Sequence, residues 1–371
     1  MARRSAPRHV FGVRLRLLPA LLALVLAATL VGLALAEFAV RRAGLAGHVA
    51  IIDTAKSKSA FQLSDNPLLG YVFKNGYQDH DHPDLQESFP FINSHGQRDV
   101  ERTWEKPPGI RRIILLGDSD VSAHGVEDLN DTISRKLETK LDPSSIEVLN
   151  MGIGGYGLVS ELELLATKGV KYSPDLVILL FERHDFVFVN SQIGHYFRAP
   201  FGIVPLKWAY RSHLFRYLIV RRRMRAEHLN LLAAYRAGGG LPRLRRLADE
   251  YHFKAFIAFW PYFSKTDIFE VQSRPLTNEA DNLVPATGET EIERLGQESH
   301  IAVFRLSPYF VRDYAERRAA FGAQTPNPAA TYTTCNDATH PNRLATEIVA
   351  NALRDILREH PEYLRSANSE Q

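Results

Sequence analysis

The feature that most constrains this chain is an alternation of short apolar runs with helical patterns between residues 112 and 358. The runs lack helical spacing and comprise Arg112–Leu116, Ile146–Asn150, Leu176–Phe181, Ala255–Trp260 and Ile301–Leu306. The helical patterns are Leu129–Leu141, Leu158–Gly169, Leu241–Tyr251 and Arg343–Arg358. Strands that alternate with helices form a parallel sheet covered on both faces. We therefore predict an α/β fold, a three-layer α/β/α sandwich around a five-stranded parallel sheet with the flavodoxin-like order 2-1-3-4-5.

The N-terminal region carries a second strong signal. Leu17 to Ala36 is a run of twenty uncharged residues, preceded by a cluster of arginines without acidic residues. A helix of this length spans the hydrocarbon core of a bilayer, which is about 30 Å thick. The basic flank places the N-terminus in the cytoplasm and the rest of the chain across the membrane. Because Ala34-Leu35-Ala36 has the form of a cleavage site, a removed signal peptide is the alternative. Either reading predicts that the rest of the chain is exported.

Composition limits the possible partners and cofactors. The net charge of +3 is too small to indicate nucleic-acid binding. Cys335 is the single cysteine of the sequence, which excludes an intrachain disulfide and a thiolate metal site. We expect no metal and no other cofactor, and the sequence does not indicate an oligomeric state.

The patterns divide the chain into five regions. The proline-rich residues before the first strand lack strong periodicity, and a long stretch between the third and fourth strands interrupts the alternation. Within that stretch, Trp208–Tyr235 is basic and amphipathic, which predicts a surface helix, with binding to anionic lipid as the alternative. The regions are a cytoplasmic basic tail (1–16), a transmembrane anchor (17–36), an irregular lead-in or stalk (37–108), an α/β domain (109–362) with a helical insertion at about 187–240, and a disordered tail (363–371).

Three residues form a candidate catalytic set. Ser119 ends Gly117-Asp118-Ser119, directly after the first predicted strand. Open parallel sheets place their chemistry at the carboxyl ends of the strands, so Ser119 is a candidate nucleophile. Asp337 and His340 lie three residues apart, after the fifth strand and before the last helix. The carboxylate can hold the imidazole in the tautomer that accepts the serine proton, so we predict a Ser-His-Asp triad.

Further candidates follow the second and third strands. The segment Gly152-Ile153-Gly154-Gly155-Tyr156-Gly157 contains G-x-G-x-x-G, which is also found in dinucleotide-binding proteins. Here it follows the second strand, while the first strand carries Gly-Asp-Ser, which favours the other use of glycine, in which backbone N–H groups bind an oxyanion. His184, in Glu182-Arg183-His184-Asp185, is a candidate N–H donor to the same oxyanion. A solvent-exposed histidine is the alternative for that position.

These motifs together resemble the SGNH, or GDSL-type, hydrolase superfamily. The resemblance implies that Ser119 is the nucleophile and that Asp337 and His340 complete the triad. It also implies an oxyanion hole formed by Ser119, Gly155 and His184, in which His184 stands where the family has asparagine. Two further departures are Glu182, where glycine is common, and Asp120, where an uncharged residue is usual. The chain is similar more narrowly to bacterial membrane-anchored members, which share the N-terminal helix, a lead-in like Asn66-Pro67-Leu68-Leu69-Gly70-Tyr71 and a segment like 92–98.

The resemblance implies an ester hydrolase, and we keep three functional hypotheses. In the first, the chain is an exported serine esterase, anchored to the bacterial inner membrane by one helix, with its domain in the periplasm or extracytoplasmic space. Its substrate would be an acyl ester of a glycan or a lipid. In the second, the same triad transfers the acyl group to a glycan of the envelope or the extracellular space. In the third, suggested by Glu182 and His184, the fold is retained in a non-catalytic envelope-binding protein.

Overall fold

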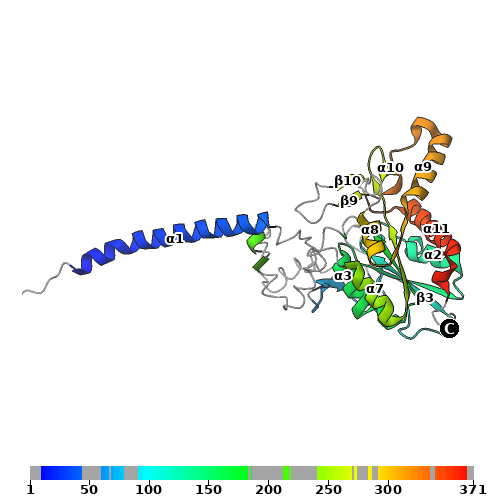
Figure 1. The fold of residues 1–371 in the computed structure, drawn as a ribbon, viewed down its shortest axis with the longest axis horizontal. Coiled ribbons are helices and arrows are strands. Elements are labelled where there is room, and N and C mark those ends of the chain that lie inside the picture. The colour runs from blue at the N-terminus through cyan, green and yellow to red at the C-terminus, as the bar shows by residue number, and fades with distance from the viewer. Residues whose placement is uncertain are drawn as a thin grey trace, which may run out of the picture.

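The computed structural model describes residues 10–43, 60–66, 68–78, 91–182, 185, 212–215, 217–218, 240–269, 271–273, 283–285, 291–334 and 339–365. A parallel sheet of five strands lies at the centre of the domain (Figure 1). Its strands are β3 (Arg111–Gly117), β4 (Ile146–Gly152), β5 (Leu176–Phe181), β6 (Lys254–Phe259) and β11 (Ala302–Arg305). They lie in the order β4-β3-β5-β6-β11, which is 2-1-3-4-5 when the five strands are numbered along the chain. The predicted fold and strand order are therefore confirmed.

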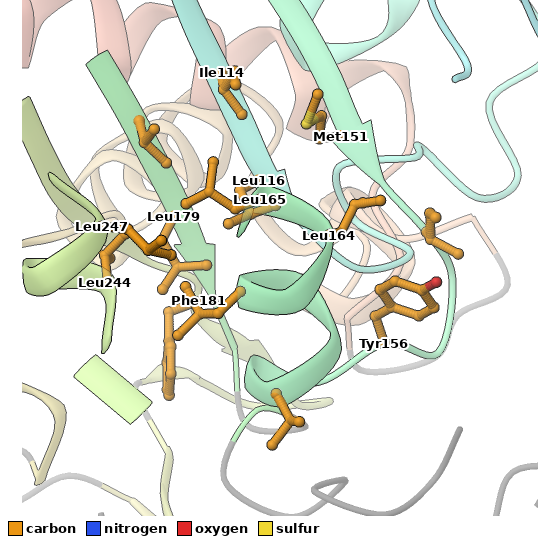
Figure 2. Packing of buried hydrophobic residues seen from close by; sticks show 14 of the residues in the cluster. Ile114, Leu116, Met151, Tyr156, Leu164, Leu165, Leu179, Phe181, Leu244 and Leu247 are labelled. Carbon is orange, nitrogen blue, oxygen red and sulfur yellow. The ribbon is translucent and has the colours of Figure 1, made fainter. Parts of the chain in front are cut away.

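Helices cover both faces of the sheet. Alternate residues of each strand point to opposite faces, so Ile114 and Leu116 of β3 belong to one apolar cluster and Ile113 and Leu115 to the other. Figure 2 shows Leu164 and Leu165 packed over the first of these faces. That face is covered by α3 (Leu158–Thr167), α7 (Gly240–Tyr251) and α8 (Glu291–Glu298), and the opposite face by α2 (Ile133–Leu141), α9 (Ser307–Phe321) and α11 (Arg343–Glu359). The three layers that the sequence predicts are thus present.

Smaller elements surround the sheet. The segment before β3 packs against the α3 face, where Phe61, Leu68, Tyr71 and Phe73 are buried in the same apolar cluster as the sheet. The short strands are β1 (Phe61–Leu63), β2 (Tyr71–Phe73), β7 (Tyr262–Phe263), β8 (Ile268–Phe269), β9 (Val271–Ser273) and β10 (Leu283–Pro285). The short helices are α10 (Pro328–Tyr332) and the 3₁₀ turns Leu129–Asp131, Gly169–Tyr172, Gly322–Gln324 and Pro361–Leu364.

The N-terminal helix α1 (Val10–Arg42) extends away from the layered domain (Figure 1). Its segment Pro19–Arg42 has a mean hydropathy of 2.4 over its most apolar window, and none of that window is buried. A core helix of a soluble domain would bury such a surface. Among the described residues, α1 is therefore the helix that is long and apolar enough to cross a membrane, as a single anchor or a signal sequence does.

The far end of α1 contacts the region of the predicted insertion. Glu37 accepts hydrogen bonds from the backbone N–H groups of His213 (2.9 Å) and Leu214 (2.8 Å) and from the Ser212 hydroxyl (2.8 Å). Most of the predicted helix Trp208–Tyr235 lies outside the described residues.

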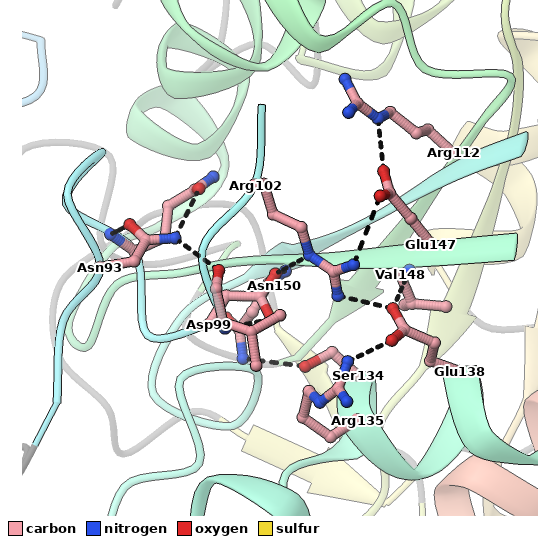
Figure 3. A network of polar contacts seen from close by, with 12 residues as sticks. Asn93, Asp99, Arg102, Arg112, Ser134, Arg135, Glu138, Glu147, Val148 and Asn150 are labelled. Carbon is pink, nitrogen blue, oxygen red and sulfur yellow. Dashed lines mark hydrogen bonds and ion pairs between the residues drawn. The ribbon is translucent and has the colours of Figure 1, made fainter. Parts of the chain in front are cut away.

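Buried ion pairs join the segment before β3 to the sheet. Arg102 binds Asp99 at 3.3 Å and Glu138 of α2 at 2.6 Å, and all three side chains are buried (Figure 3). Asp99 also accepts the N–H of Asn150 in β4 at 3.2 Å. Burial raises the pKa of Asp99 to about 6, although Arg102 acts in the opposite direction. One guanidinium therefore contacts two buried carboxylates, one from the segment before β3 and one from α2.

Replacing Arg102 tests this arrangement. We expect Arg102→Ala to lower the free energy of unfolding by about 3–5 kcal/mol, because it leaves Asp99 buried without its cation and leaves Glu138 with Arg135 alone. The loss is smaller near pH 5 than near pH 8, since Asp99 can then take up a proton. Urea unfolding at both pH values measures the effect. Arg245→Ala, which removes an exposed pair with Asp249, is the control and changes stability by about 0–1 kcal/mol. Equal effects of the two substitutions would contradict the prediction.

Candidate active site

Ser119 lies in a tight loop directly after β3. We refer to residues 118–127 as the serine loop. The loop closes on itself, because the N–H of Ser122 donates to the carbonyl of Asp118 at 3.0 Å and the N–H of His124 donates to the carbonyl of Ser119 at 2.9 Å. The Asp118 carboxylate accepts the N–H of Asp120 at 3.1 Å. Ser119 is 7% exposed, so the loop holds its hydroxyl in a largely dry environment.

The serine loop packs directly on the end of the neighbouring strand β4. A Cβ atom on Gly152 would lie 2.2 Å from the backbone nitrogen of Ser122, so only glycine allows this approach. Two residues earlier in β4, the Asn150 side chain donates to the carbonyl of Val121 at 2.8 Å. The parallel pairing of β3 with β4 therefore fixes the serine loop from one side.

His340, which is distant from Ser119 in the sequence, lies beside the Ser119 side chain. Its Nε2 atom lies 3.0 Å from the Ser119 Oγ atom. Asn342 caps α11 by accepting the N–H groups of Leu344 and Ala345, both at 3.0 Å, and this fixes the start of the helix just after His340. The carbonyl of His340 accepts the N–H of Thr334 at 3.0 Å. Backbone contacts on both sides of His340 thus hold the ring beside Ser119.

This geometry permits proton transfer from serine to histidine. With its proton on Nδ1, His340 accepts the Ser119 hydroxyl at Nε2, and the distance is within the range that a general base needs. The Asp118 carboxylate is a weaker acceptor for the same hydroxyl, at 3.4 Å. The His124 ring packs on His340 with the ring centroids 4.8 Å apart.

Gly154 and Gly155 form the second backbone segment near Ser119. A Cβ atom on Gly154 would lie 3.7 Å from the Cβ atom of Ser119, and Gly155 has a φ of +77°, in the left-handed region that favours glycine. The Tyr71 hydroxyl donates to the carbonyl of Gly154. Burial and then the charge of Asp118 raise the pKa of Tyr71 well above its ordinary value, so this hydroxyl keeps its proton. Tyr71 therefore holds the glycine segment through the carbonyl of Gly154.

Two predicted site residues lie outside the described residues. These are Asp337, the expected partner of His340, and His184, the expected third oxyanion donor. Of the predicted set, the structure brings Ser119 and His340 into contact and places the segment of Gly155 beside them. The roles of Asp337 and His184 stay predictions.

Five buried carboxyl groups gather behind Ser119. They belong to Asp118, Asp120, Glu161, Glu182 and Asp185, each at most 3% exposed. The carboxylate oxygens of Asp118, Asp120 and Glu182 lie within 4.8 Å of one another, a spacing at which oxygen ligands can share a cation. Burial, followed by the charges of Asp118 and Asp120, raises the pKa of Glu161 well above its ordinary value. Burial and then the charge of Glu161 do the same for Asp185.

The motifs did not identify three residues of this site. Tyr71 stands in the lead-in motif that ends at this tyrosine, but nothing in that motif shows which loop its hydroxyl reaches. His124 follows Ser119 by five residues, and its proximity to His340 depends on the left-handed turn at Ala123, which has a φ of +55°. Glu161 lies on the buried side of α3. The feature of the sequence that could have identified it is an acidic residue within an apolar helical pattern.

Replacing Glu161 tests the protonation of the carboxyl cluster. Because the pKa of Glu161 is raised in the folded protein, its contribution to stability is complete below the unfolded value of 4.5 and is lost as the pH rises through the folded value. Glu161→Gln cannot lose a proton, so we expect its free energy of unfolding to fall less with rising pH than that of the wild type. Urea unfolding over a pH series above 4.5 measures both slopes. Parallel slopes would show that Glu161 is ionised in the folded protein.

The likeness of this chain to known proteins is limited to distant structural similarity. No protein-family model and no curated protein matches the chain. Solved structures that it resembles include an acetyl xylan esterase (14% identity, 66% of this chain and 99% of that chain, TM-score 0.38) and a carbohydrate acetylesterase family member from Sinorhizobium meliloti (14%, 67% and 98%, TM-score 0.36). A lipase/acylhydrolase from Enterococcus faecalis is another (13%, 68% and 97%, TM-score 0.37). Others are of the GDSL type, the family that the motifs of this chain resemble.

Proposed function

We propose that this chain is a serine esterase that hydrolyses acyl esters with Ser119 as its nucleophile. The observation that carries the proposal is the 3.0 Å contact between the Ser119 Oγ atom and the His340 Nε2 atom. The two residues are 221 positions apart in the sequence, and each is held by its own backbone loop at the carboxyl edge of the sheet. A hydroxyl and an imidazole paired in this way form the activated nucleophile of acyl transfer.

In the proposed reaction, the Ser119 oxygen attacks the ester carbonyl carbon and its proton moves to Nε2 of His340. The oxyanion is bound by the backbone N–H groups of Ser119 and Gly155 and by the ring of His184. The imidazolium then protonates the leaving alcohol, and an acyl-enzyme remains. Water, deprotonated by His340, attacks this ester and releases the acid. Asp337 holds the imidazole ring in the tautomer that both steps need.

The carboxyl cluster is compatible with this chemistry because part of its charge is absent. A negative charge near a developing oxyanion opposes its formation, most strongly where water is excluded. The raised pKa values of Glu161 and Asp185 leave these groups protonated over a wider pH range. The charge behind Ser119 is thereby lower than the number of carboxyl groups indicates.

The N-terminal helix determines the proposed location of the enzyme in the cell. In our proposal α1 is an uncleaved anchor in the bacterial inner membrane, and the domain lies in the periplasm or extracytoplasmic space. The contact of Glu37 with Ser212 and the two following residues supports this, because it joins the end of the helix to the region of the insertion. The substrates would then be acyl esters of glycans or lipids on that side of the membrane.

Substitution of the serine tests the proposed function. We expect Ser119→Ala to lower the turnover of p-nitrophenyl acetate by the full chain in detergent by at least about 10³-fold, because it removes the nucleophile. A fluorophosphonate probe should label the wild type and leave this variant unlabelled. Ser160→Ala, which alters a buried serine bonded to the Leu68 carbonyl, is the control and should keep activity and labelling. Hydrolysis by S119A at the wild-type rate would refute the proposal.

Substitution of the glycine tests the oxyanion segment. A Cβ atom on Gly155 would lie 2.8 Å from the Tyr71 hydroxyl, so Gly155→Ala displaces the segment and we expect kcat to fall by about 10²-fold. Gly76 has a similar φ of +66° with nothing within 4 Å of an added Cβ. Gly76→Ala therefore carries a comparable backbone strain and should keep kcat. An equal kcat for the two variants would remove Gly155 from the oxyanion hole.

A further inference from the structure

We propose that Arg98 is a positioning residue for Ser119, which holds the serine loop in the conformation that catalysis needs. The inference rests on the proposed function for its catalytic consequence. Arg98 precedes the sheet and belongs to the segment that packs against its α3 face. Its side chain is 1% exposed, so the guanidinium is a cation in the interior of the domain.

The guanidinium binds four carbonyl groups of the serine loop. Nη1 donates to the carbonyls of Ser122 at 2.7 Å and Ala123 at 2.6 Å. Nη2 donates to the carbonyl of Glu127 at 3.1 Å and to that of Val126. These acceptors come from two stretches of the loop, so one planar group joins both.

Only arginine has the donor geometry for this set of contacts. Its two terminal nitrogens diverge in a fixed plane, whereas lysine offers its protons from one nitrogen and cannot span both stretches. Burial lowers the pKa of Arg98 to about 10, with Asp128 acting in the opposite direction, so the group stays charged at neutral pH.

The loop needs an external restraint because its conformation is strained. Ala123 has a φ of +55°, which an alanine adopts only when other contacts compensate. The next residue, His124, donates its N–H to the carbonyl of Ser119, and the Ser122 hydroxyl donates to the same carbonyl at 3.2 Å. If Ala123 relaxes, the contacts that orient Ser119 change with it. Arg98, which binds the carbonyls of Ser122 and Ala123, opposes that relaxation.

Arg112 provides a matched control at the opposite end of β3. It is 0% exposed and donates to the carbonyls of Trp104 at 3.0 Å, Tyr172 at 3.1 Å and Glu105 at 3.2 Å. It therefore resembles Arg98 in burial and in its carbonyl partners. Its contacts lie at the amino end of the sheet, away from the serine loop.

The experiment compares Arg98→Lys with Arg112→Lys in the full chain in detergent. Both substitutions should lower the unfolding midpoint. We expect R98K to lower kcat for p-nitrophenyl acetate by about 10–10²-fold with KM little changed, because a misplaced nucleophile slows chemistry more than binding. R112K should keep kcat. Amide hydrogen exchange in peptides covering residues 118–127 should be faster in R98K and unchanged in R112K.

The outcomes separate this inference from the proposed function. An R98K protein that folds and keeps kcat, or an equal loss of kcat in R112K, overturns the positioning role. If the wild type fails to hydrolyse the ester, the proposed function fails, and hydrogen exchange still decides whether Arg98 holds the loop. If R98K does not fold, R98K/A123G is compared with A123G, because glycine takes the left-handed φ without strain while the loop still lacks the guanidinium that joins its two stretches. Lower kcat and faster loop exchange in the double variant support the inference, and equal values overturn it.

Discussion

The close packing of two backbone loops at the carboxyl ends of β3 and β4 is the constraint on which the candidate site depends. Parallel neighbours end at the same edge of a sheet, so the loop after each strand must share that edge with the other. Here the distance is so short that a Cβ on Gly152 would meet the backbone of Ser122 at 2.2 Å. One loop carries Ser119 and the other carries Gly155. The sheet therefore brings Ser119 and the backbone of the glycine segment together before any other side chain is considered.

Buried charge is treated differently at the two ends of the sheet. Near the lead-in, Arg102 pairs with Asp99 and Glu138, and Arg112 pairs with Glu147 at 2.7 Å (Figure 3). Behind Ser119, burial raises the pKa values of Glu161 and Asp185 and so favours the neutral form of these two groups. Ion pairs thus hold one end of the sheet, whereas protonation of Glu161 and Asp185 lowers the buried charge near Ser119.

The sequence was sufficient to predict the sheet and the pairing of Ser119 with His340. It was insufficient to predict the features that depend on tertiary contacts. The predicted run Leu176–Phe181 has the bounds of β5, because a fully buried strand has an apolar sequence throughout. Helix α9 was not predicted, since Phe310 is its one buried apolar residue and no apolar stripe marks it. Ser119 and His340 were predicted as partners because each follows a strand, which places both at one edge. The hydrogen bond from Tyr71 to the Gly154 carbonyl joins residues 83 positions apart, and no local sequence pattern predicts it.

The segment before the sheet completes the site. A five-stranded sheet with its covering helices places Ser119 and the glycine segment at one edge, but backbone pairing ends where the strands end. From that point the loops need other partners. Tyr71 supplies one for Gly154, and Arg98 supplies the carbonyl contacts of the serine loop. Both lie in the part of the chain that leads from α1 to the sheet, so a domain cut at the first strand would lose buried apolar residues such as Phe61 and Phe73 together with the contacts that hold the loop of Ser119. For this chain, the segment between α1 and the sheet is therefore part of the candidate site.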